Sequence, residues 1–351
     1  MFAARIYFQQ GVMIERKRTL PYPAGILVRR GQLVAAPDVV VEESFISGHQ
    51  LFDVSRGLGV SKARADELVV CKVGSKVTAG DLLAGPLGIT RRVIRATNSG
   101  KVVYIGDGNV LLEVVGTPTQ LKAGMPGEVV DLIPEQGVIL QTGGDLVQGV
   151  WGNNQIAEGE LYGCLDSTDQ ALTVEVLNDL PPGIILTAGY CADPKVLKTA
   201  VEKSISGIIL ASLHPALIPL AAQLQVPVMI LEGFGCHPVN PLAREIILAN
   251  QGSHSALNSQ PVNKLTNTRP ELVIPHSVTQ SPSKPALVEL FAPGKKVRII
   301  NSCRLGRTGI LIDLVGEQTL PSGMRAAAAK VQSGDQEEIV PLVNLEIVIT
   351  E

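Results

Sequence analysis

The stretch from Gly183 to Asn250 constrains the fold of this chain more than any other, because only here does the sequence alternate between strand and helix patterns. Short apolar runs rich in Ile, Val and Leu are separated by helical spacers, and the runs are GIILTAG, GIILAS and PVMILEG. Buried parallel strands with crossover helices have this pattern. The sequence therefore predicts a central parallel α/β sheet unit.

Each expected helix of this unit begins at a residue followed by proline. The three steps are Asp193-Pro194, His214-Pro215 and Asn240-Pro241, and His237-Pro238 adds another nearby. A capping residue before a proline is a typical helix start, because proline suits the first helical position. The repeated step supports the alternation of strands and helices.

Reactive side chains follow the ends of the expected strands. In an open parallel sheet, ligands bind outside the carboxyl ends of the strands. We therefore expect a ligand pocket at this rim, lined by Tyr190, Cys191, His214, Glu232, Cys236 and His237.

The chemistry of this rim stays open. Two Cys and two His suit tetrahedral zinc, and a cysteine beside a histidine suits nucleophilic catalysis. The spacing matches no recognised ligand pattern, however, and the histidines also serve as helix caps while the cysteines serve as small buried hydrophobes. Glycines after Glu232 would equally permit binding without chemistry. Neither dinucleotide nor P-loop glycine motif is present, so no cofactor is expected.

Composition narrows the class of protein. A chain of 351 residues predicts two or three domains, and a net charge of -3 argues against coating nucleic acid or anionic membrane. Five scattered cysteines indicate no disulfide framework, and the first residues show no secretory signal, so a cytoplasmic location is expected. Met1 and Met13 both remain candidate starts.

One uncharged stretch, between Lys203 and Glu232, is long enough to span a bilayer. Pro215, Pro219 and Pro227 interrupt it, and it follows the order strand, helix, strand. We therefore interpret it as a buried α/β segment and expect no membrane partner.

The N-terminal part, residues 13–120, is β-rich. Two segments, starting at Gly31 and Gly74, share G-x-x-V-x-A-x-D and predict a repeated hairpin unit. VGSKVTAGDLLA, followed by ATNSGKVVYIGDGNVLLEV, resembles the barrel-sandwich hybrid fold of biotinyl and lipoyl domains. Carrier domains present a modifiable Lys between these motifs, whereas this chain has residues 88–92 without Lys, and Lys101 lies on another strand. The resemblance implies a docking module without a swinging arm.

Residues 121–250 are expected to form a β-rich segment followed by the α/β domain. Trp151 precedes a turn, and we interpret it as an aromatic cap over the β-layer, with a ligand platform as the alternative. Residues 251–285 are rich in Ser, Asn, Gln, Pro and Thr, a composition that predicts a linker.

Residues 286–351 are predicted to form five short strands. GKKVRI, LGRTGI and VPLVNLE resemble an SH3-like barrel of the KOW type, although Cys303-Arg304 stands where that family has Gly and Pro. Basic side chains of this unit are candidate phosphate contacts, and they are balanced by acidic residues elsewhere in it. The candidates for nucleic-acid contact are Lys295, Lys296, Arg298, Arg304 and Arg307.

The expected fold is multidomain α/β plus β. It combines a barrel-sandwich hybrid-like domain, a central parallel α/β sheet unit and a C-terminal SH3-like β-barrel. Because no catalytic signature is complete, the leading hypothesis is a non-catalytic binding or scaffold protein with a protein partner. The alternatives are a nucleic-acid- or ribosome-associated factor acting through the last barrel, and a metal- or Cys/His-dependent enzyme at the rim. The partner's identity and the oligomeric state stay open.

Overall fold

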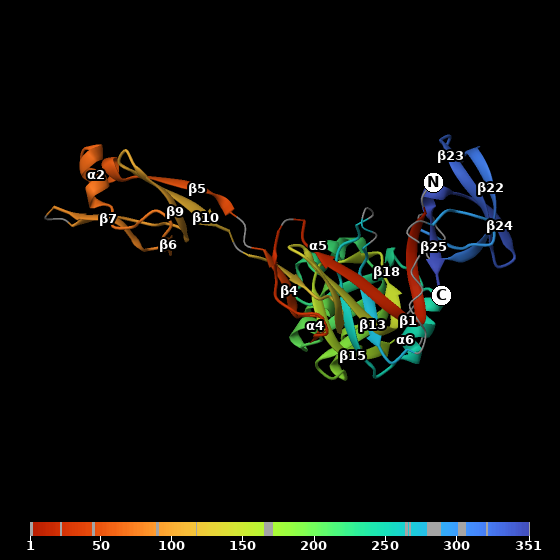
Figure 1. Ribbon diagram of the computed structural model, residues 1–351. Coiled ribbons are helices and arrows are strands. Elements are labelled where there is room, and N and C mark those ends of the chain that lie inside the picture. Colours follow the sequence, from red (N-terminus) through yellow and green to blue (C-terminus); the bar gives the residue numbers. More distant parts are fainter. Residues whose placement is uncertain are drawn as a thin grey trace.

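The computed structural model describes residues 3–21, 23–43, 46–88, 91–116, 118–164, 171–263, 266, 268–278, 289–300, 307–320 and 322–350. Its described part is mostly β. A central body carries an outlying unit at one end and a C-terminal unit at the other (Figure 1). Central body and C-terminal unit share a 16-stranded mixed sheet with the main order β14-β18-β17-β16-β15-β19-β20-β13-β1-β25-β21-β22-β23-β24.

Four parallel strands form the α/β part of this sheet: the three predicted apolar runs form three of them, and a further strand precedes these in the sequence. They pair in the order β15, β16, β17, β18, and the short β14 (Trp151–Gly152) adds an antiparallel edge. The residues of β16, β17 and β18 are almost wholly buried, because helices cover both faces, whereas Glu160 and Tyr162 of β15 are exposed. The bounds are β15 Ile156–Cys164, β16 Ile184–Cys191, β17 Gly207–Leu213 and β18 Val228–Phe234.

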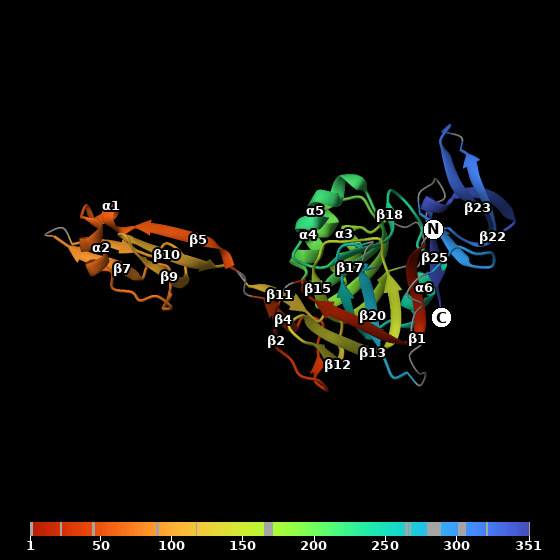
Figure 2. The ribbon, with the colours of Figure 1, turned by 45° about the horizontal axis from the view of Figure 1, so that its top comes forward.

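The helices start where the proline steps predicted. The side chains of Asp193, His214 and Asn240 each accept a backbone N–H of the helix that follows. Figure 2 shows α3, α4 and α5 together on one face of the sheet, with α6 elsewhere, beside β1. Two separate apolar clusters fill these faces. The bounds are α3 Val174–Asn178, α4 Pro194–Glu202, η1 Pro215–Leu217, α5 Ile218–Gln223 and α6 Pro241–Ala249.

Trp151 packs as a cap, as one of the two interpretations expected. It lies against the cluster under α4 and α5, and its ring meets that of Phe234 edge to face, with centroids 6.0 Å apart. The neighbouring Asn153 donates to three carbonyl oxygens around the end of α5 and accepts from Val228 N–H. This corner is fixed by packing and hydrogen bonds.

The prediction of a linker at residues 251–285 is wrong for much of that segment. β19 (His254–Asn258) and β20 (Glu271–Pro275) lie in the middle of the sheet, where β19 pairs with β15 and β20 pairs with β13. Both are buried. Their short apolar cores are flanked by Ser, Asn and Pro, so the average composition of the segment concealed them.

Beyond β20 the sheet continues through β13 (Gly137–Gln148) and β1 (Ala4–Thr19), which are antiparallel. A third apolar cluster lies where these strands meet smaller ones. Those smaller strands are β2 Gly25–Ile26, β3 Leu33–Val34, β4 Val39–Glu43, β11 Thr119–Lys122 and β12 Gly127–Ile133.

The outlying unit is smaller than the predicted domain of residues 13–120, because residues 13–43 and 118–122 belong to the central body. It contains a four-stranded and a two-stranded sheet with its own apolar core. Its elements are β5 Ile46–Asp53, α1 Val54–Leu58, α2 Lys62–Leu68, β6 Lys76–Val77, β7 Leu82–Leu87, β8 Arg92–Arg95, β9 Gly100–Gly106 and β10 Asn109–Val115.

The two similar sequence segments therefore lie in different units. The copy at Gly31 supplies β3 and β4 to the central body, whereas the copy at Gly74 supplies β6 and β7 to the outlying unit. The local turn and strand pattern recurs, but the two copies do not form one symmetric domain.

Five strands form the described C-terminal unit, pairing in the order β25-β21-β22-β23-β24 around a separate apolar cluster. β1 joins this unit to the central body, because Ala4–Tyr7 pairs in parallel with β25 while Phe8–Thr19 pairs with β13. Residues 4–12, which precede the candidate start Met13, are thus part of the sheet. The bounds are β21 Lys296–Ile299, β22 Thr308–Thr319, β23 Arg325–Ser333, β24 Gln336–Pro341, η2 Leu342–Asn344 and β25 Leu345–Ile349.

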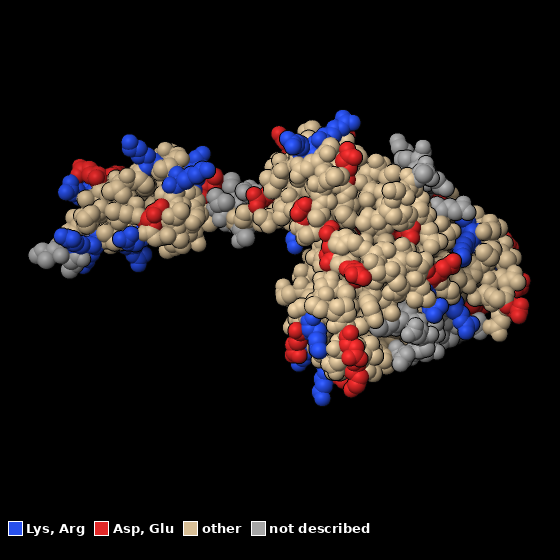
Figure 3. Space-filling model, turned by 90° about the horizontal axis from the view of Figure 1, so that it is seen from below, with Lys and Arg blue, Asp and Glu red and all other residues tan. Residues whose placement is uncertain are grey.

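Among the described residues, every helix is too short or too polar to cross a bilayer. In the space-filling view, Lys and Arg side chains stand out on both sides of the outlying unit, while much of the central body presents neither charge (Figure 3). A groove that runs along β1 is lined by charged side chains, most of which belong to β1 itself.

Candidate functional site

A groove of about 1340 Å³ runs along β1, and we call it the edge groove. Its first wall is β1 itself. Its second wall comes from described residues between Asn258 and Arg269, and Glu289 and Ile349 also line it. The residues of β1 that line it include consecutive positions from Val12 to Thr19. Since neighbouring side chains of a strand point to opposite faces, this lining shows that the groove follows the edge of the strand.

Backbone pairing leaves that edge of β1 open. The register places Leu20 opposite Gln136, and Leu20 N–H donates to Gln136 carbonyl at 3.0 Å. In an antiparallel ladder such bonded pairs alternate, so the even-numbered residues of this half of β1 bond to β13. The N–H and C=O groups of Met13, Glu15, Lys17 and Thr19 therefore face the groove, and of these the Glu15 carbonyl already accepts a hydrogen bond from Arg16 Nη1. Within the described chain, no strand pairs with them.

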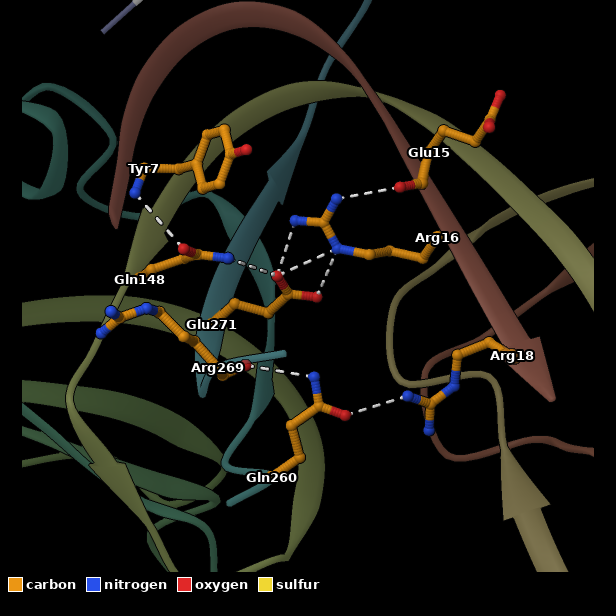
Figure 4. A network of polar contacts seen from close by, with 8 residues as sticks. All are labelled: Tyr7, Glu15, Arg16, Arg18, Gln148, Gln260, Arg269 and Glu271. Carbon is orange, nitrogen blue, oxygen red and sulfur yellow. Dashed lines mark hydrogen bonds and ion pairs between the residues drawn. The ribbon is translucent and has the colours of Figure 1, made fainter. Parts of the chain in front are cut away.

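A bend in β1 shapes the space beside it. The register with β13 shifts between Gln9 and Val12, and Gly11 has a left-handed backbone with φ 61°. Gly11 N–H donates to Asp145 Oδ1 at 2.7 Å, which holds the bulge in place. Figure 4 shows the resulting arch of β1, with Tyr7 and Arg16 on either side of Glu271.

A row of buried polar side chains forms the floor near the arch. Gln148, Glu271 and Asn258 lie opposite one another on β13, β20 and β19, so they share one face of the sheet. Each is at most 3% exposed. Gln148 Oε1 accepts Tyr7 N–H at 3.3 Å, and its amide donates to Glu271 at 3.4 Å.

Arg16 neutralises this floor. Its Nε and Nη2 donate to the Glu271 carboxylate at 3.0 and 2.7 Å, and its Nη1 donates to Glu15 carbonyl (Figure 4). Burial opposes the charged form of Arg16, but the adjacent carboxylate of Glu271 outweighs it and raises the arginine pKa. Arg16 is therefore a structural cation with its charge already compensated.

Arg18, two residues further on, has neutral partners. Its Nε donates to Lys122 carbonyl at 3.0 Å and its Nη1 to Gln260 Oε1 at 3.0 Å. Gln260 in turn donates to Arg269 carbonyl at 3.1 Å. Burial lowers the pKa of Arg18. No carboxylate of the described chain lies within ion-pair distance of this guanidinium.

The residues expected at the rim differ in burial. Tyr190 is half-buried beside Cys191 and Cys236, and burial is the main reason that its pKa is raised. Cys191 is buried, which raises its thiol pKa to about 11, whereas Cys236 is exposed. A thiol with a pKa this high is a poor nucleophile at neutral pH.

Both rim histidines have local structural partners. His214 Nδ1 accepts Ala216 N–H at 3.2 Å and caps the following helical turn. The backbone of His237 exchanges two hydrogen bonds with Ser212 Oγ, both at 3.0 Å, and its Nε2 lies 3.1 Å from Phe234 carbonyl. These contacts agree with the capping interpretation of the rim.

Glu232 does not face the expected pocket. Its Oε1 accepts Asn240 N–H at 2.9 Å, and its Oε2 lies 3.5 Å from Arg298 Nη1. Arg298 also lies 3.9 Å from Glu346, whose other oxygen binds Arg269 at 2.5 Å. We call these four residues the buried charge cluster. Burial raises the pKa of Glu232, and the nearby Arg298 opposes that shift.

The expected nucleic-acid contacts are likewise scattered. Arg298 is fully buried, which is incompatible with a contact to nucleic acid. Lys295 forms an ion pair with Glu289 at 3.0 Å. Lys296 is half-buried, Arg307 is exposed, and Arg304 lies outside the described residues. The sequence run does not form one basic surface within the described part.

Sequence reasoning missed the edge groove. The basic segment from Met13 to Arg30 was visible, and alternation of Ile14, Arg16 and Arg18 marks one face of a strand. Their partners come from Gln148, Asn258 and Glu271, however, and no local pattern links residues so far apart. The sequence therefore contained a pattern that indicated the strand but none that indicated the groove.

Among the described residues, no group of three or more His, Cys, Asp or Glu side chains is arranged to hold a metal ion. Comparison with protein-family models and with curated proteins gave no match to this chain. The edge groove is the largest arrangement of convergent polar groups described above, and it is our candidate functional site.

Proposed function

We propose that this chain is a non-catalytic binding or scaffold protein, and that the edge groove takes an extended peptide segment of a protein partner. The single observation that carries the proposal is the open edge of β1. Its outward backbone groups can pair with an added strand, which is a common mode of peptide recognition.

The size of the groove supports a chain-like ligand. Sites for small molecules typically enclose about 300–1,000 Å³, whereas this groove has about 1340 Å³. It extends along many residues of one strand and has polar groups at intervals on its walls. An extended peptide matches both the length and the regular spacing of donors and acceptors along a strand.

The rim gives less support to an enzyme. Cys191 is buried with a raised pKa, both histidines are engaged locally, and Glu232 is part of the buried charge cluster. A nucleophile, a base and an orienting group would need to be within hydrogen-bond reach of each other. Binding along the edge groove needs no such constellation.

The other units fit a scaffold. We infer that the outlying unit is a barrel-sandwich hybrid-like docking module and that the C-terminal unit is an SH3-like barrel of the KOW type. The sequence resemblances and the separate apolar cores support these assignments. A nucleic-acid role would depend on Lys296 and Arg307 among the described candidates, since Arg298 is buried and Lys295 is paired.

A selection with a random peptide library displayed on phage tests the proposal. The full chain is immobilised, and the best enriched peptide is then titrated against the chain and two variants. Lys17→Pro removes an N–H that faces the groove, and proline is tolerated on strand edges. Lys17→Gln removes the same charge but keeps the N–H, so it is the matched control.

We expect enriched peptides whose affinity falls about tenfold or more in Lys17→Pro and changes less in Lys17→Gln. Both variants must retain the circular dichroism spectrum and urea midpoint of the parent chain. The proposal fails if no peptide is enriched, or if Lys17→Pro, correctly folded, binds as well as the control.

A further inference from the structure

Two unused donors converge beside Gly124. A Cβ built on Gly124 would lie 2.5 Å from Asn258 Nδ2 and 3.4 Å from Arg18 Nη2. Gly124 has φ +81°, a backbone conformation that favours glycine. The amide of Asn258 and the guanidinium of Arg18 therefore pack closely against Gly124, at a position where a side chain would not fit. Both Arg18 and Asn258 line the edge groove.

Asn258 is built into the sheet and has a donor to spare. The residue is 2% exposed and pairs with Glu271 on β20 and Ile156 on β15. Its Oδ1 accepts Gln260 N–H at 3.3 Å, which orients the amide. Within the described residues, no acceptor is bonded to its Nδ2. Because Asn258 lines the edge groove, this donor can bind an acceptor on a ligand there.

Arg18 supplies the charge. Its Nε and Nη1 bond to neutral oxygens of Lys122 and Gln260, which leaves Nη2 without a bonded acceptor among the described residues. The carboxylate whose charge acts on it belongs to Glu271, which is already engaged with Arg16. A partly buried guanidinium without a counterion attracts an anion, and its planar fork suits a carboxylate.

We infer that Arg18 and Asn258 form a carboxylate subsite of the edge groove, so that the peptide it takes is acidic. An Asp or Glu side chain of the added strand would accept hydrogen bonds from Arg18 Nη2 and Asn258 Nδ2 while its backbone pairs with β1. This inference rests on the proposed function, since it specifies which peptides the groove selects.

The test extends the library selection to the composition of the enriched peptides. The best binder with a shared Asp or Glu is compared by fluorescence anisotropy with the same peptide carrying Asn or Gln there. We expect the acidic form to bind at least about tenfold more tightly to the full chain. The preference should weaken with added salt, because a charge pair is involved.

Three variants assign the preference to these residues. Arg18→Gln removes the cation, and Asn258→Asp replaces the donor with a repelling carboxylate while keeping the acceptor for Gln260. Lys198→Gln on the exposed face of α4 is the matched control for loss of one positive charge. We expect the first two to abolish the preference for the acidic peptide and the control to keep it.

The outcomes separate the two proposals. If no peptide is enriched, the proposed function fails. If peptides are enriched without a shared acid, or if a folded Arg18→Gln or Asn258→Asp variant keeps the full acidic preference, the subsite is refuted while peptide binding stands. A variant whose urea midpoint falls below that of the parent chain is set aside. The comparison of the acidic and neutral peptides on the unmodified chain then decides whether the subsite prefers an acid.

Discussion

Replacing Arg298 with Met tests the role of the buried charge cluster. Arg298 lies on β21 with no exposed surface, next to Glu232 of β18 and Glu346 of β25. It therefore joins the C-terminal unit to the α/β strands. In the native cluster the positive charges of two arginines balance the negative charges of two glutamates. Without Arg298, Glu232 would lose its cation, while Glu346 would keep Arg269.

The magnitude follows from this imbalance. Removing one partner of a buried ion pair typically costs about 3–5 kcal/mol, because a charge is left uncompensated. Several cluster atoms, including Glu232 Oε2 and Arg298 Nε, have no hydrogen-bond partner in the described chain. The cluster therefore depends on charge balance more than on complete hydrogen bonding, and we expect a loss of about 3–5 kcal/mol for Arg298→Met.

Urea unfolding of the full chain measures this loss. Trp151, the single tryptophan, packs against Phe234 at the end of β18 and reports on the neighbouring sheet. A loss of this size should lower the urea midpoint by on the order of 1 M. Circular dichroism followed in parallel shows whether the C-terminal unit unfolds in the same transition.

The double variant Arg298→Met with Glu232→Gln is the control. It removes one charge of each sign, leaves the pair Arg269–Glu346 and keeps an acceptor for Asn240 N–H. We expect it to recover much of the lost stability. The deficit of the single variant should also shrink as pH falls, because burial raises the Glu232 pKa and protonation removes the uncompensated charge. A loss below about 1 kcal/mol, or a double variant less stable than the single, would refute the reasoning.

Two other predictions concern titration and thiol reactivity. The hydrogen bond to Asp145 raises the pKa of His276, so its stabilising contribution is fully present below about pH 6.5 and is lost as pH rises through the folded-state pKa. Because the His276 side chain is 40% exposed, we expect His276→Gln to lower the free energy of unfolding by at most about 1 kcal/mol at about pH 5. Thermal unfolding should show a smaller loss at about pH 8. A larger loss at the higher pH would contradict the direction of the pKa shift. Iodoacetamide should label exposed Cys236 in the native chain and buried Cys191 only after urea is added, as peptide mass spectrometry will show; equal native labelling would contradict the burial.

The parallel strands and their helices were predictable because their signals are local. Apolar runs define β16 to β18, and Asp193, His214 and Asn240 before proline define three helix starts. β19 was not predictable by composition, because a five-residue buried strand lies within a polar segment. Its place in the sheet is decided by partners on β15 and β20.

The candidate site was less predictable than the fold. Tyr190 and Cys191 do lie at the end of a parallel strand, as expected, but Glu232 turns toward Arg298 of another unit. Arg298 appeared to belong to an exposed basic run, yet packing of the C-terminal unit buries it. A sequence shows which charges are present, and tertiary packing decides which of them meet each other.

The pairing of β1 with β25 also constrains how this protein is made. Residues 4–7 emerge from the ribosome long before their partners, residues 346–349, are synthesised. Contacts with such a large sequence separation form slowly, since much loop-closure entropy must be lost first. During translation the first strand therefore keeps unpaired backbone on this side as well, and an unpaired strand edge is prone to aggregation. A chaperone that shields this segment would protect the nascent chain until residues 346–349 are made.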